Sequence, residues 1–304
     1  MKIAVLGPGG VGGLLAGVLE RAGSEVVIVA RESTAEAIAT NGLHVQSVIF
    51  AELTTRPRAL TRLEEPVDAL IVATKAAGLS DALDRIAVSP PVVLPLLNGL
   101  DHLSVLRERF PARSVLAGSI RVEADRPEPG VIVHSSPFLL VDMAASDPAV
   151  VPAMQALADA LSAAEVPVRV LGSDAEVMWS KLVRLNALAC TTSAYDKLLG
   201  EIRSTPELRA DLVGAIEEAC AVGRAEGAED VDAERAIGEL GLAHETLGSS
   251  MQRDIAAGRA PELDAIPGSV LRAAARHGLQ CPTIERLVGM IEARIAGTTA
   301  GTAA

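Results

Sequence analysis

Aromatic residues and positive charge are both scarce in this chain. Only 2% of its 304 residues are Phe, Tyr or Trp, and 39 acidic residues against 27 basic ones give a formal net charge of −12. Nucleic acids are bound mainly by basic surfaces and aromatic stacking platforms, and anionic membranes by basic surfaces. The composition therefore argues against a nucleic-acid or membrane partner.

Targeting and spanning segments are also missing from the pattern. No apolar run reaches the length of a membrane-spanning helix, and the first predicted strand begins so early, at Lys2, that it leaves no room for a signal peptide. We therefore expect a cytoplasmic protein.

Cysteine and histidine are few and scattered. Cys190, Cys220 and Cys281 are far apart, and neither they nor the five histidines show the spacing of a metal or redox motif. We expect reduced, buried thiols and no metal site.

The chain's length and hydrophobic content, 304 residues and 49%, favour two folded domains. Up to about residue 172, strand-like runs alternate with helical ones, as in a buried parallel sheet. From about residue 173 the spacing becomes helical throughout. The predicted fold class is α/β, with domains at 1–172 and 173–298 and a disordered tail at 299–304.

The predicted strands are Ile3–Leu6, Glu25–Ala30, Ala69–Ala73, Val92–Leu96, Val115–Ile120, Val131–His134, Leu139–Val141 and Val166–Val170. The later ones, around Pro127, Pro129 and Gly130, suggest an antiparallel extension of the sheet. The predicted helices of the second half are Ala175–Leu199, Thr205–Glu226, Ala233–Leu242, Ser250–Ala257, Glu262–His277 and Thr283–Ile295.

A glycine-rich turn joins the first predicted strand to a predicted helix over 11–22. Its sequence is Gly7-Pro8-Gly9-Gly10-Val11-Gly12, which has the spacing G-x-G-x-x-G. In that motif the first glycine allows a tight turn, the second lets the backbone approach a pyrophosphate, and the third lets helix pack on strand. The alternative is a purely structural turn. Because strand and helix flank the motif, it predicts a Rossmann-type dinucleotide-binding domain.

The residue after the second strand indicates which dinucleotide binds. NAD-specific sites usually carry an acid there, whereas this chain has Ala30-Arg31. An Arg fork binds a 2′-phosphate that a carboxylate would repel. The alternative is a solvated loop cation, and nearby Glu32 is a complication. The pattern favours NADP(H).

Several further blocks, spread over nearly the whole chain, resemble the ketopantoate reductase (2-dehydropantoate 2-reductase) family. They are Val72-Ala73-Thr74-Lys75, Leu96-Leu97-Asn98-Gly99, the P-G-x-x-x-H segment Pro129–His134, Trp179-Ser180-Lys181-Leu182, Ser249-Ser250-Met251-Gln252-Arg253-Asp254, and the G-R-x-x-E-x-D segment Gly258–Asp264. The resemblance implies a Rossmann-type N-terminal domain and an all-helical C-terminal domain, with substrate in the cleft between them.

The resemblance also implies roles for individual residues. Lys181 would be the general acid and Glu262 its carboxylate partner, while Ser250 would bind the substrate carboxylate. Asn98 would lie between nicotinamide and substrate, and Lys75 near the ribose and phosphates. Each residue also has a purely structural alternative. Lys181 could be a solvated helix lysine, and Glu262 could be a first-turn glutamate after Pro261. Ser249 or Ser250 could cap a helix, Asn98-Gly99 could form a simple turn, and Lys75 could be a surface cation.

The chain departs from the family's pattern where Asn is usual, four and eight positions after the lysine. Those positions hold Leu185 and Ala189. At about 100° per residue they lie within about 40° and 80° of Lys181, on the substrate side, whereas Asn186 points about 140° away. The hydroxyl of ketopantoate would then lack an expected partner, at a cost of about 1–3 kcal/mol. The second departure, Pro261, should matter little.

These observations favour NADPH-dependent reduction of a 2-oxo acid, with 2-dehydropantoate to pantoate, a step of coenzyme A biosynthesis, as the specific hypothesis. Lysine in a closed site suits proton donation to the alkoxide that hydride delivery creates. A relative that reduces a less polar 2-oxo acid is the first alternative, and a non-catalytic NADP-binding sensor is the second. The helical domain could also supply an apolar face for a homodimer.

Overall fold

The computed structural model describes residues 1–301, with side chains described up to residue 297. The chain forms two compact units. We call Met1–Leu97 with His102–Val177 the strand-rich unit, and Asn98–Asp101 with Met178–Ala304 the helical unit. The observed division at 177/178 follows the predicted one at 172/173 by a few residues, and the short segment Asn98–Asp101 groups with the helices.

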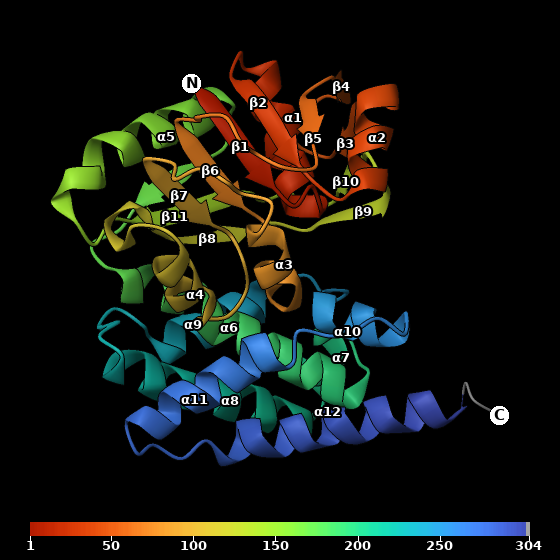
Figure 1. The fold of residues 1–304 in the computed structure, drawn as a ribbon. Helices are drawn as coiled ribbons and strands as arrows, with labels where there is room; N and C mark the ends of the chain where they lie inside the picture. Colours follow the sequence, from red (N-terminus) through yellow and green to blue (C-terminus); the bar gives the residue numbers. More distant parts are fainter. Residues whose placement is uncertain (302–304) are drawn as a thin grey trace. The chain divides into compact units, whose positions relative to one another are not determined.

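A five-stranded parallel sheet forms the centre of the strand-rich unit (Figure 1). Its strands, in spatial order, are β5 (Arg58–Leu60), β2 (Glu25–Val29), β1 (Lys2–Leu6), β6 (Ala69–Val72) and β7 (Val92–Pro95). The register aligns Leu6 of β1 with Val29 of β2 and with Val72 of β6, so the carboxyl ends of these strands share one edge. The chain leaves β1 toward β2 on one side and later enters β6 on the other. Such a topological switch point is where open α/β sheets bind ligands.

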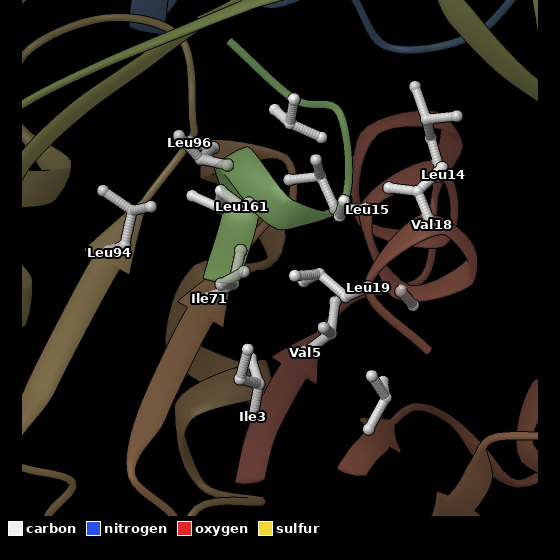
Figure 2. Packing of buried hydrophobic residues seen from close by; sticks show 14 of the residues in the cluster. Ile3, Val5, Leu14, Leu15, Val18, Leu19, Ile71, Leu94, Leu96 and Leu161 are labelled. Carbon is white, nitrogen blue, oxygen red and sulfur yellow. The ribbon is translucent and has the colours of Figure 1, made fainter. Parts of the chain in front are cut away.

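Helix α1 (Gly10–Arg21) covers one face of this sheet. Figure 2 shows Leu15 and Leu19 of α1 pointing toward Val5 and Ile71 of the sheet, with Leu161 of α5 (Val151–Ala163) beside them. Every residue of α1 from Gly12 to Leu19 is buried, and each buried Leu contributes about 1.5–3 kcal/mol. This packing fixes the start of α1 against the carboxyl end of β1.

The remaining strands form two smaller sheets, and this corrects the predicted antiparallel extension. One sheet has the order β4 (Leu53–Thr55), β3 (Leu43–Ser47), β10 (Val131–His134), β9 (Ala124–Glu128), and the other β12 (Val168–Val170), β11 (Leu140–Ala144), β8 (Ala117–Arg121). The β9–β10 and β8–β11 pairs are antiparallel, as expected. However, β10 pairs with β3 and not with a strand of the central sheet. An isolated bridge joins Val93 of β7 to Val115, just before β8, but β8 itself belongs to the other small sheet.

Shorter helices connect the strands of this unit. They are α2 (Glu32–Asn41), α3 (Leu79–Leu83), α4 (His102–Arg109) and the single 3₁₀ turns η1 (Ala76–Gly78), η2 (Ala112–Ser114) and η3 (Pro148–Val150). Two of them begin at the carboxyl edge of the central sheet, because α2 follows β2 directly and η1 follows β6.

The second half is helical, as predicted (Figure 1). Its elements are α6 (Asp174–Tyr195), α7 (Leu199–Ser204), α8 (Pro206–Ala225), α9 (Ala233–Leu242), α10 (Ser250–Ala256), the π-helical turn η4 (Asp264–Gly268), α11 (Ser269–Arg276) and α12 (Pro282–Gly301). No helix within residues 1–301 is long and apolar enough to cross a membrane.

Two of the predicted helices differ from those in the structure, and the predicted tail differs in part. The helix expected over Glu262–His277 is instead a π turn containing Pro267, followed by α11, because proline has no N–H to continue the ladder. The helix expected to reach Leu199 ends at Tyr195, before Asp196 at φ 52°. Of the tail predicted at 299–304, α12 extends to Gly301 and residues 302–304 lie outside the described residues.

Candidate active site

The glycine-rich turn lies at the carboxyl end of β1, and the first and third motif glycines are needed for its shape. Gly7 has φ +88°, and a Cβ there would lie 2.8 Å from Thr74 Cγ2. A Cβ on Gly12 would lie 2.3 Å from the carbonyl oxygen of Gly7, so only glycine allows α1 to start this close to the strand. The turn and the helix–strand contact therefore have the structure that the motif predicts.

Gly9 differs from these two, because a Cβ there would meet no heavy atom within 4 Å. Nothing in the described protein requires glycine at this position. Gly9 is also the N-cap of α1, whose first turn holds no acidic residue, and the first amides of a helix have no partner within the helix. The open space at Gly9, at the positive end of a helix, fits the pyrophosphate of a dinucleotide.

Arg31 lies where the second strand ends, as the N-cap of α2, and its side chain is exposed. Neighbouring Glu32 does not pair with it: Arg85 Nη1 lies 3.3 Å from Glu32 Oε1. The pKa of Glu32 is lowered by its own backbone amide and then by Arg85. The carboxylate that complicated the sequence interpretation is thus held by another arginine. Lys75 is exposed at the end of β6, as the N-cap of η1.

Three predicted site residues meet in the helical unit. Lys181 Nζ donates to Asn98 Oδ1 at 2.8 Å, and Asn98 Nδ2 donates to Glu262 Oε2 at 2.8 Å. The amide oxygen accepts from the ammonium and the amide nitrogen donates to the carboxylate, the one orientation that satisfies both charged groups. We call this arrangement the Lys–Asn–Glu relay. All three residues are partly buried, so their contacts with solvent are reduced.

Local structure fixes each member of the relay. Lys181 lies on α6, two residues after Trp179, which is fully buried and packs so closely on α8 that a Cβ on Gly223 would lie 3.1 Å from its ring. Asn98 follows β7 and precedes Gly99, which has φ +84°. Glu262 lies two residues before the η4 turn, and its carbonyl accepts from the Ile266 amide at 3.0 Å. The buried Trp179, the turn at Gly99 and the η4 turn therefore fix the positions of the three relay residues.

Ser249 and Ser250 have different structural positions, which the sequence could not distinguish. Ser249 is buried, caps α10 by accepting from the Gln252 amide at 3.0 Å, and shares a 2.8 Å hydrogen bond with Thr192. Ser250 is exposed at the first position of α10. Among the described residues no hydrogen bond joins Ser250 to the relay. No local pattern indicates Thr192, because its partner Ser249 lies 57 residues away in sequence.

Leu185 and Ala189 lie on α6 beyond Lys181, with Leu185 partly buried and Ala189 1% exposed. Asn186 is fully buried, and its Oδ1 accepts from Cys190 Sγ at 3.6 Å. Its Nδ2 has no hydrogen-bond partner among the described residues. Asn186 is therefore inside the helical unit and does not replace the amides absent at 185 and 189.

The three cysteines are free and buried, as predicted. Burial raises the pKa of Cys190 to about 12 and those of Cys220 and Cys281 to about 11. At neutral pH all three are protonated and unreactive. They contribute packing to the helical unit and no nucleophile.

Two family models match the chain. The model described as "Ketopantoate reductase PanE/ApbA" matches residues 3–141, and its "C terminal" counterpart matches residues 175–295. The chain belongs to the ketopantoate reductase family. This confirms the resemblance inferred from the motifs, and it makes the protein a nicotinamide-dependent oxidoreductase of the ketopantoate reductase type.

Curated relatives match nearly the whole length of the chain. "2-dehydropantoate 2-reductase" of Halobacterium salinarum is 28% identical, over 96% of this chain and 98% of its own. "Uncharacterized oxidoreductase YkpB" of Bacillus subtilis is also 28% identical, with the same coverage of both chains.

Solved structures share the fold. The 2-dehydropantoate 2-reductase of Geobacter metallireducens has a TM-score of 0.87 and 25% identity, over 96% of this chain and 99% of its own. A D-mandelate dehydrogenase, solved with NADH and anilino(oxo)acetate, has a TM-score of 0.88 at 22% identity, over 98% of this chain and 99% of its own. The predicted α/β fold class, with a Rossmann-type unit and a helical unit, is confirmed.

Proposed function

We propose that this family member reduces a 2-oxo acid to the 2-hydroxy acid with NADPH, and that ketopantoate, reduced to pantoate, is its substrate. The Lys–Asn–Glu relay carries the proposal, because it presents a positioned ammonium in a partly buried setting. The names of several relatives, 2-dehydropantoate 2-reductase, support the substrate.

The chemistry needs a hydride and a proton. When bound, the nicotinamide cofactor supplies the hydride, which adds to the carbonyl carbon while the C=O π electrons move to oxygen. That oxygen must be protonated as its charge develops. Of the three N–H donors of the Lys181 ammonium, one donates to Asn98, and another would donate its proton to the substrate oxygen.

Asn98 and Glu262 would act on the lysine in this scheme. The amide oxygen of Asn98 fixes the direction of the ammonium, and Glu262 in turn fixes the amide. A group aimed in advance at the atom where charge develops lowers the barrier without reorganisation during the reaction. A non-catalytic sensor would have no need of such an aligned acid, so the relay also argues against the sensor hypothesis.

Binding of substrate and cofactor would use the exposed groups. Ser250 is available for the substrate carboxylate because Ser249 caps the helix instead. Arg31 supports NADPH over NADH, because its exposed guanidinium can bind a 2′-phosphate and Glu32 is held by Arg85. Lys75 would lie near the ribose and phosphates.

A second candidate is a less polar 2-oxo acid, and Leu185 and Ala189 favour it. Where the family usually has asparagine, these side chains offer no hydrogen bond to a hydroxyl of the substrate. The likeness to a D-mandelate dehydrogenase shows that this fold also serves an enzyme named for an aryl hydroxy acid. The non-reacting end of the substrate distinguishes the two candidates.

A substrate panel tests the proposal. Oxidation of NADPH and of NADH would be followed with ketopantoate, 2-oxoisovalerate and phenylglyoxylate, for the wild type and for Lys181→Ala. Lys197→Ala, which removes a surface lysine paired with Glu201, is the matched control. We expect turnover that Lys181→Ala lowers by about 10²–10⁴-fold and that Lys197→Ala leaves unchanged. Tight NADPH binding without turnover of any 2-oxo acid would overturn the proposal in favour of a sensor.

A further inference from the structure

Arg272 of α11 binds two chain segments, one that carries Asn98 and one that carries Glu262. Its Nη2 donates to Asp101 Oδ2 at 2.5 Å, and its Nη1 donates to Asp264 Oδ1 at 2.7 Å. The same Nη2 also donates to the carbonyl oxygen of Asp264 at 2.9 Å. One planar guanidinium thus holds two carboxylates and one main-chain carbonyl.

Both aspartates lie close in sequence to relay residues. Asp101 is three residues after Asn98, on the same short segment, and Asp264 is two residues after Glu262, where the η4 turn begins. Because Asn98 and Glu262 bond directly at 2.8 Å, a shift of one segment against the other would lengthen that bond. Arg272 resists such a shift from outside the relay.

The two segments also touch directly, so little movement is tolerated between them. A Cβ on Gly99 would lie 1.9 Å from the carbonyl oxygen of Ala265 in η4. The η4 turn is π-helical, with the Gly268 amide bonding the Leu263 carbonyl at 3.1 Å. Isolated π turns occur often at functional sites, where they re-aim neighbouring residues. Here the turn begins two residues after Glu262.

We propose that Arg272 is a positioning residue of the reductase, holding Asn98 and Glu262 at the separation at which Lys181 is aimed. This inference rests on the proposed function. Surface ion pairs contribute little to stability, and the side chains of Arg272, Asp101 and Asp264 are 43%, 48% and 88% exposed. Rates, by contrast, are sensitive to small displacements of reacting groups. Arg272 is therefore expected to matter for rate far more than for folding.

The same helix supplies a matched control. Arg276, four residues on, pairs with Glu226 at 3.0 Å and is 53% exposed, but neither residue belongs to the Asn98 or Glu262 segments. Arg276→Gln removes a similar surface ion pair from α11. An effect found in Arg272→Gln and absent from Arg276→Gln cannot be attributed to loss of charge on this helix.

Asparagine-selective ¹⁵N labelling gives a readout that needs no substrate. The chain has three asparagines, Asn41, Asn98 and Asn186, so a spectrum shows few side-chain amide pairs and Asn98→Ala assigns the relevant one. We expect Arg272→Gln to shift the Asn98 amide resonances and leave those of Asn41 unchanged. Arg276→Gln should leave the Asn98 resonances at their wild-type positions.

Kinetics complete the test. Arg272→Gln should lower kcat about tenfold with little change in KM for NADPH, and Arg272→Lys, which keeps charge but loses the fork, should recover part of the loss. Asp101→Asn, which loses the carboxylate contact alone, should act in the same direction and replaces Arg272→Gln if that variant fails to fold. Wild-type Asn98 resonances and wild-type kcat in the Arg272 and Asp101 variants would overturn the positioning role. If no 2-oxo acid is reduced, the proposed function fails, while the resonance shifts still decide whether Arg272 positions Asn98.

Discussion

Asn98→Ala removes both hydrogen bonds that join Lys181 to Glu262 in the relay. Each bond is 2.8 Å long and has one charged partner, and a hydrogen bond to a charged group contributes about 1.5–3 kcal/mol. If the transition state loses the stabilisation of one such hydrogen bond, kcat falls about 10- to 100-fold, since about 1.4 kcal/mol corresponds to a factor of ten. The glycine-rich turn is untouched, so the loss should be larger in kcat than in KM for NADPH.

A double-mutant cycle tests whether the bonds act through the lysine. In a Lys181→Ala background the amide has no ammonium to orient, so Asn98→Ala should cost less than about threefold there. Asn41→Ala, an exposed asparagine of α2, is the control for asparagine loss. Fluorescence of the single tryptophan, the buried Trp179, reports whether each variant keeps the helical unit folded. Full multiplicative losses in the double variant would refute the relay as an orienting device.

Three further predictions concern cofactor, substrate and pH. Arg31→Gln should raise Kd for NADPH about 10- to 100-fold and leave NADH binding unchanged, measured by titration calorimetry with exposed Arg113→Gln as control; equal losses for both cofactors would contradict the 2′-phosphate assignment. Leu185→Asn with Ala189→Asn should raise kcat/KM for ketopantoate relative to phenylglyoxylate about tenfold or more, and an unchanged ratio would mean that α6 does not contact the substrate. Burial lowers the pKa of His134 from its ordinary 6.5. On acidification the unfolded chain therefore binds this proton before the folded chain does. The free energy of unfolding then decreases as the pH drops below 6.5. Urea unfolding of His134→Gln followed by circular dichroism should lack this part of the pH dependence, and a wild-type pH dependence in the variant would contradict the reasoning.

Four strands of the central sheet were predictable because they are nearly continuous apolar runs, whereas the edge strand β5, with the sequence Arg-Ala-Leu, was not predicted. The predicted Ile3–Leu6 and Glu25–Ala30 correspond to β1 and β2 within about a residue at each end. By contrast, β9 has the sequence Ala-Asp-Arg-Pro-Glu, which has no apolar alternation and contains proline. It pairs at the edge of its sheet, where proline is tolerated, and such a strand is set by its partner rather than by its own residues.

The resemblance to the family pointed to Lys181, Asn98 and Glu262 as site residues, but not to how they connect. Lys181 and Asn98 are 83 residues apart in sequence, and Asn98 and Glu262 are 164 apart. No local pattern can show that the amide lies between the two charges.

The polar residues of α6 sharpen the question of substrate. The helix carries buried polar side chains elsewhere, because Thr191 and Thr192 are fully buried. The Thr191 hydroxyl donates to the Ala187 carbonyl at 2.8 Å, and the Thr192 hydroxyl donates to the Leu188 carbonyl at 2.7 Å. At these two positions the helix backbone satisfies the buried hydroxyls. At Leu185 a partner would have to come from the substrate, and there the chain has an aliphatic side chain. A substrate hydroxyl buried against it would go unpaired, at about 1–3 kcal/mol, or roughly 10- to 100-fold in kcat/KM. The ratio of kcat/KM for ketopantoate to that for an acid without the hydroxyl thus measures the chemistry of this helical turn directly, and a ratio well above one would require a hydroxyl partner outside α6.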